Sequence, residues 1–141
     1  MSAFLKTGLH QRLDLLLSVV MTFEVFVYFA AALLHLGIRM RVGSLVLAVP
    51  DAILPASIVE TILGLAVASN LAVLIASKRQ SIRITTVVHL FALVGVLLGM
   101  VALAIRVGPP PSPHWNLHYV MLVCIAIVMV LILLRRKSKT E

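Results

Sequence analysis

Four long apolar runs dominate the hydropathy pattern of the chain, and the short segments between them hold most of the charged residues. The runs lie at 13–36, 56–76, 84–105 and 113–134. At about 1.5 Å rise per residue, helices of these lengths match a hydrocarbon core of about 30 Å. The pattern predicts an all-α integral membrane protein, a single transmembrane domain built as an up-down-up-down four-helix bundle.

Helix signals flank the runs. Gly37 follows the first run as a C-cap glycine would, and Ser112-Pro113 reads as an N-cap serine followed by a first-turn proline. Ser57 and Glu60 match the S-x-x-E capping box that starts helices, here the second run. The connections are then 37–55, 77–83 and 106–112. We expect an interfacial segment at 1–12 and an interfacial or partly re-entrant piece around Leu45–Val49.

Lysine and arginine are unevenly distributed over the connections. With four spans, the two termini and 77–83 share one side, which holds nine of these residues: Lys6, Arg12, Lys78, Arg79, Arg83, Arg135, Arg136, Lys137 and Lys139. The other side holds three, Arg39, Arg41 and Arg106. Because cytoplasmic loops carry the excess of these cations, both termini are predicted to be cytoplasmic.

Composition supports a membrane protein and narrows the function classes. The 141 residues are 62% apolar and only 12% charged, against about 25% charged in soluble domains. The net charge of +7 sits at the ends of apolar runs without interleaved aromatics, which favours lipid head groups over nucleic acid. No nucleotide-binding loop, nucleophile elbow or C-x-x-C occurs, so we expect no enzyme. We expect a multi-pass protein of the bacterial or archaeal cell membrane.

Glu24 lies in the middle of the first run. On a helical wheel Glu24, Tyr28, Ala31 and His35 fall within about 40° of one another, which should face them into the bundle. One interpretation is a protonatable acid on a proton or substrate path, because ionisable residues inside a membrane are functional candidates. The other is a neutral, structural glutamate bonded to Tyr28 or to a neighbouring helix.

His35, Glu60 and His118 should converge near the outer end of the bundle. Two imidazoles and a carboxylate fit a divalent metal, and the two histidines fit axial ligation of haem b. The structural alternative needs no cofactor. In that case both histidines lie near the interface, Trp115 and Tyr119 form an aromatic belt, and Glu60 completes the capping box.

The third run carries a histidine and a small-residue stripe. His89 is expected to be a buried histidine bonded to Asn70 or to a backbone carbonyl. Gly95 and Gly99 form a G-x-x-x-G that lets helices approach closely, within the bundle or in a homo-oligomer.

The stretch from the third run into the fourth resembles small four-span bacterial membrane proteins with no assigned activity. The matching positions are His89, Gly95, Gly99, Gly108, Pro109, His118 and Tyr119. The resemblance implies a four-helix membrane protein and no activity. The chain is similar to DoxX-like proteins in architecture only.

Three functional hypotheses follow. The preferred one is a non-enzymatic accessory or ligand-binding protein, alone, as a homo-oligomer or in a larger membrane complex, whose outer polar cluster holds a ligand. The first alternative is a haem- or metal-binding electron-transfer or sensor protein that uses His35, Glu60 and His118. The second is a proton-coupled transporter, an oligomer in which Glu24 takes up the proton.

Overall fold

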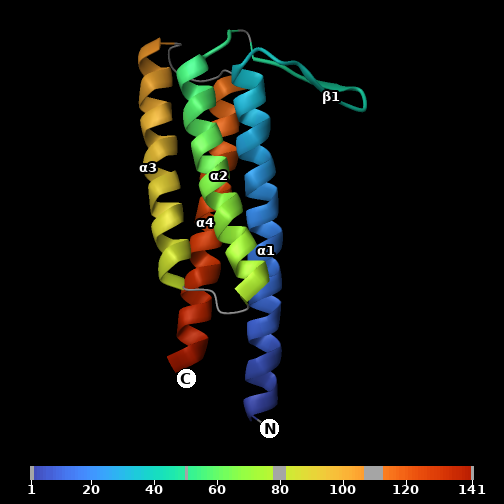
Figure 1. The fold of residues 1–141 in the computed structure, drawn as a ribbon, viewed down its shortest axis with the longest axis vertical. Helices are drawn as coiled ribbons and strands as arrows, with labels where there is room; N and C mark the ends of the chain where they lie inside the picture. Colours follow the sequence, from blue (N-terminus) through green and yellow to red (C-terminus); the bar gives the residue numbers. More distant parts are fainter. Residues whose placement is uncertain (1, 50, 78–81, 107–112, 141) are drawn as a thin grey trace.

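The computed structural model describes residues 2–49, 51–77, 82–106 and 113–140, and they form a bundle of four helices with a small β-hairpin at one end (Figure 1). The helices are α1 (Ser2–His35), α2 (Leu54–Ser77), α3 (Ile82–Arg106) and α4 (Pro113–Thr140). The predicted all-α fold is confirmed. The N- and C-termini lie at the same end of the bundle, which we call the terminal end, and the opposite end is the hairpin end.

Each helix is long and apolar enough to cross a membrane. The stretches that meet this condition are Gln11–His35, Leu54–Ala76, Ile82–Arg106 and His114–Lys137. They agree with the predicted spans to within a few residues. Residues 2–12, expected as an interfacial segment, form the first turns of α1, which extends beyond the other helices in Figure 1.

The core is a continuous apolar seam along the bundle axis. α1 packs against α2 and α4, and α3 packs against α4 and less extensively against α2. The seam holds fully buried side chains such as Met21, Val67 and Val128. Large apolar side chains also cover the outside, for example Ile105, which is 83% exposed. A surface of this kind is suited to lipid rather than to water.

The connection after α1 is a β-hairpin. β1 (Met40–Val42) pairs antiparallel with β2 (Leu45–Leu47), and Gly43 supplies the positive φ of +62° that the turn requires. Gly37, with φ +83°, ends α1 as predicted. The hairpin extends sideways away from the bundle (Figure 1), so it does not re-enter between the helices, and the interfacial alternative stays a prediction.

The start of α2 also differs from the prediction. α2 begins at Leu54, and the Ser57 amide donates to the Ile53 carbonyl, so Ser57 lies inside the helix and is not its N-cap. The expected capping box therefore does not form, and the Glu60 carboxylate is free to bond elsewhere. The Ile53 amide donates to the His35 carbonyl at 2.7 Å, which fixes the start of α2 against the end of α1.

Candidate functional site

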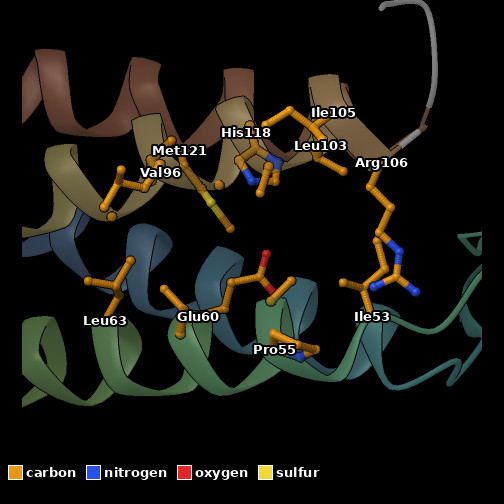
Figure 2. A pocket seen from close by; sticks show the side chains of 16 residues that line it. Ile53, Pro55, Glu60, Leu63, Val96, Leu103, Ile105, Arg106, His118 and Met121 are labelled. Atoms are coloured by element: carbon orange, nitrogen blue, oxygen red, sulfur yellow. The ribbon is translucent and has the colours of Figure 1, made fainter. Parts of the chain in front are cut away.

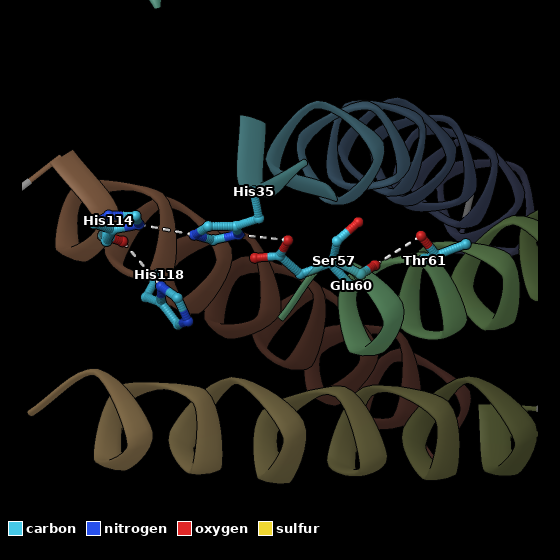
Figure 3. A network of polar contacts seen from close by, with 6 residues as sticks. All are labelled: His35, Ser57, Glu60, Thr61, His114 and His118. Atoms are coloured by element: carbon cyan, nitrogen blue, oxygen red, sulfur yellow. Dashed lines mark hydrogen bonds and ion pairs between the residues drawn. The ribbon is translucent and has the colours of Figure 1, made fainter. Parts of the chain in front are cut away.

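Three ionisable side chains form one hydrogen-bonded chain at the hairpin end, as Figure 3 shows. His35 of α1 places Nδ1 2.7 Å from Glu60 Oε2 on α2 and Nε2 2.9 Å from His114 Nδ1 on α4. All three side chains are buried. We call Glu60, His35 and His114 the His–Glu trio.

The two imidazoles of the trio meet edge to edge. The His35 and His114 rings are parallel within 1°, and their centroids lie 5.1 Å apart. This centroid distance agrees with the 2.9 Å contact between His35 Nε2 and His114 Nδ1 at the facing ring edges. The shared proton therefore lies close to the line between the two nitrogens, where a hydrogen bond is strongest.

Both ends of the trio are polar atoms without a partner in the described part of the chain. Glu60 Oε1 and His114 Nε2 are buried and accept or donate no hydrogen bond there. Buried polar atoms in this state are rare in folded proteins and call for water, a ligand or a proton. The trio is thus a chain of two hydrogen bonds, and the polar atom at each end of the chain can make one more hydrogen bond.

His118, predicted to join His35 and Glu60, lies beside the trio. Its Nδ1–H donates to the His114 backbone carbonyl at 2.9 Å, and its ring centroid lies 6.3 Å from that of His35. Because a carbonyl only accepts, Nδ1 carries a proton, and Nε2 of the neutral ring is an acceptor.

A cavity of about 580 Å³ opens between α2 and α3, and Figure 2 shows Glu60 and His118 entering it from opposite walls. The rest of the lining is almost entirely apolar and includes Leu63, Val96 and Met121. Gly95 and Gly99 line it as well, so the predicted small-residue stripe faces other helices of the same chain. The apolar wall makes the two polar groups the specific features of this cavity.

The geometry bears on the metal and haem hypotheses. Both ring nitrogens of His35 are taken up by Glu60 and His114, so neither is free for a metal or an iron in this conformation. Within the described ranges, no group of three or more His, Cys, Asp or Glu side chains is placed to hold a metal ion. Binding of a metal or of haem stays a prediction, and this conformation does not present His35, Glu60 and His118 together as its ligands.

A second histidine–carboxylate pair lies deeper in the bundle. His89 Nε2 on α3 is 3.0 Å from Glu24 Oε2 on α1, and both side chains are fully buried. His89 Nδ1–H donates to the Thr85 carbonyl at 2.8 Å, as the sequence predicted for a backbone partner. One proton is therefore shared between Nε2 and Oε2, and the pair is neutral overall wherever that proton sits.

Tyr28 lies on the same face of α1, between Glu24 and His35. Its phenol is fully buried and has no hydrogen-bond partner among the described residues. Of the two partners predicted for Glu24, Tyr28 or a neighbouring helix, the structure therefore shows the second. Gly64 of α2 approaches it closely, since a Cβ there would lie 3.2 Å from the Tyr28 Cβ. Sequence analysis did not single out Gly64.

His114 is a site residue that the sequence analysis did not single out. It lies in the first turn of α4, fully buried, one helical turn before His118. The i, i+4 spacing of two histidines after a proline start was the signal that could have found it. Trp115, expected in an exposed aromatic belt, is also buried, against Ile53 and Leu103.

Two glycine substitutions should differ in their effect on stability. A Cβ at Gly99 would lie 2.7 Å from His118 Nε2, whose ring is held by its bond to His114, whereas a Cβ at Gly95 would meet the flexible end of Leu63 at 2.9 Å. We expect Gly99→Ala to lose about 1–3 kcal/mol of unfolding free energy relative to Gly95→Ala. Titration with SDS in mixed micelles measures both. The equal gain in helix propensity cancels in the comparison, and equal stabilities would contradict the packing.

Comparison with known protein families, curated proteins and solved structures gave no match to this chain. Function must therefore be inferred from the geometry of the site.

Proposed function

We propose that this chain is a non-enzymatic, multi-pass membrane protein that binds a lipid-soluble ligand in the cavity between α2 and α3. The observation that carries the proposal is the combination of an apolar cavity of about 580 Å³ with a buried carboxylate oxygen, Glu60 Oε1, that has no partner among the described residues. An apolar cavity with a few convergent polar groups is the usual form of a small-molecule site.

The two polar groups of the cavity define the ligand's head group. Glu60 Oε1 is an acceptor when the carboxyl group is ionised, and His118 Nε2 is an acceptor because its Nδ1 holds the proton. A ligand that satisfies both must donate hydrogen bonds. The ligand class is therefore an apolar molecule with a hydroxyl or amine group.

The position of the cavity mouth supports entry from the lipid. Three lining residues, Val59, Leu98 and Ile105, are exposed on the outside of the bundle. That surface contacts acyl chains when the four helices span a bilayer. A lipid-soluble molecule can then move sideways into the cavity without passing through water.

The proposal includes an orientation. Nine lysines and arginines belong to the segments at the terminal end and three to those at the hairpin end, so both termini are assigned to the cytoplasm of a bacterial or archaeal cell. The common position of the two termini in Figure 1 supports an even number of crossings. The cavity and the trio then lie in the outer half of the membrane.

The test is the identity of what stays bound after mild detergent extraction. We expect native mass spectrometry of the wild-type protein to detect a bound hydroxyl- or amine-bearing lipid. Ala102→Trp should reduce its occupancy at least about tenfold, equivalent to about 1.4 kcal/mol of binding free energy, because Ala102 lines the cavity and an indole would fill it.

The matched control is Ala104→Trp, on the same helix and also exposed, but outside the cavity lining. It should retain the ligand. Wild-type protein without any bound molecule, or a ligand retained equally by both tryptophan variants, would contradict the proposal.

A further inference from the structure

The His–Glu trio has the structure of a proton wire, and we propose that it carries protons between the hairpin end of the bundle and the carboxyl group of Glu60 in the cavity. This activity stands on the trio itself. Its coupling to ligand exchange rests on the proposed function, since the same carboxyl group would bind the ligand's donor.

The proton count of the trio supports a wire. Each of its two hydrogen bonds, 2.7 and 2.9 Å long, contains one proton. With only these two protons the three side chains carry a net charge of −1, which is costly in an apolar interior. A third proton makes the trio neutral, and its two places are the atoms without partners, Glu60 Oε1 and His114 Nε2.

Uptake of a proton proceeds by three short transfers. A proton arrives at Nε2 of His114 while His114 Nδ1–H passes its proton to Nε2 of His35. His35 Nδ1–H passes its proton to Oε2 of Glu60, and the carboxylate becomes a carboxylic acid. Charge and atoms balance, because one proton enters, each imidazole ends neutral with its proton on Nε2, and no electrons move.

The ionisable groups around the trio are consistent with proton transfer from His114 towards Glu60. Asp51, exposed at the hairpin end, acts electrostatically on His114 and can attract protons there. The other ionisable groups that face the trio are Tyr28 from α1, Arg106 from the α3 wall of the cavity and His118 from α4. Neutralised Glu60 has lost the negative charge that attracts a cationic amine, because its new proton lies on Oε2 and donates to His35 Nδ1, while Oε1 remains an acceptor. One proton would thus exchange against one cationic ligand.

The experiment is magic-angle-spinning NMR of ¹⁵N-histidine- and ¹³C-glutamate-labelled protein in lipid bilayers, titrated from alkaline to acidic pH without added ligand. His35 and His114 should both change from the Nδ1–H to the Nε2–H tautomer, with the same midpoint as protonation of Glu60. The trio takes up one proton in this step, so the single midpoint belongs to the three coupled groups and not to one residue. His118 and His89 are internal controls, because both keep Nδ1–H on a backbone carbonyl.

Two variants make the result specific. Glu60→Gln removes the group that takes up the proton, so the joint change of tautomer should disappear. Leu97→Ala, exposed on α3 and outside the cavity lining, should leave it intact. Unchanged tautomers in His35 and His114, midpoints separate from that of Glu60, or a joint change that persists in Glu60→Gln would overturn the wire. Because the wild-type spectra alone decide the first two outcomes, a variant that fails to fold does not block the test. A wire without a bound ligand would refute the proposed function and leave the wire standing.

Discussion

Replacing His35 by leucine should lower the free energy of unfolding by about 3–5 kcal/mol, the range for a buried pair that loses one partner. His35 is fully buried and makes both hydrogen bonds of the trio. Leucine has a similar volume, so the loss comes from polar atoms rather than from a void. It leaves Glu60 and His114 without the partner they share. Titration with SDS in mixed micelles, followed by circular dichroism, measures the change.

His118→Leu is the matched control. Its imidazole is also buried on the hairpin-end half, but its bond goes to a carbonyl of its own helix, and we expect about 1 kcal/mol or less. The double variant His35→Leu/Glu60→Leu should lose less than the sum of the two single variants, by about 0.5–3 kcal/mol, because each single change already removes the shared bond. Additive losses, or equal losses in His35→Leu and His118→Leu, would show that His35 does not hold the trio together.

The four helices could be predicted from the sequence because each depends on local composition alone. Runs of more than twenty apolar residues between charged segments allow almost no other structure in this length of chain. The helical wheel also predicted that one face of α1 points into the bundle. In the structure the residues of that face are all fully buried: Glu24, Tyr28, Ala31 and His35. Faces of a single helix follow from its period, which the sequence contains.

The partners across helices could not be predicted in the same way. Whether His89 or Tyr28 bonds Glu24 depends on the rotation and the axial shift of α3 against α1, and neither is set by hydropathy. The sequence offered Tyr28, one turn away, or a neighbouring helix as the partner of Glu24, but it could not name His89, 65 positions further along the chain. His114 was missed for a related reason. The predicted fourth span includes His114, but its contact with His35 depends on how α4 is rotated and shifted against α1.

The two histidine–carboxylate pairs differ in what surrounds them, and this difference is the basis of the functional assignment. Glu24 and His89 share one proton, and the His89 ring is fixed at its other nitrogen by a backbone carbonyl. Glu60 and His35 belong to a chain that continues to His114 and faces a cavity. The deep pair therefore has the properties of a structural contact, and the trio has those of an exchange site.

An apolar carbodiimide should distinguish the two carboxyl groups. Dicyclohexylcarbodiimide dissolves in lipid and reacts with protonated carboxyl groups in apolar surroundings. We expect it to modify Glu60 at least about tenfold faster than Glu24, a difference of about 1.4 kcal/mol in activation free energy. Glu60 lines a cavity whose mouth faces lipid, whereas Glu24 is fully enclosed and does not line this cavity. Peptide mass spectrometry locates the modified residue.

The pH dependence and one variant connect this labelling to the mechanism. Because only the acid form reacts, the rate at Glu60 should rise as the pH falls, in parallel with the protonation that the trio allows. Ala102→Trp should protect Glu60 by filling the cavity, and Ala104→Trp should not, since only Ala102 is part of the lining. Equal modification of Glu24 and Glu60, or a Glu60 that stays unmodified at acidic pH, would mean that the cavity does not admit a lipid-soluble molecule to its carboxyl group, and ligand binding at Glu60 would then have no route from the membrane.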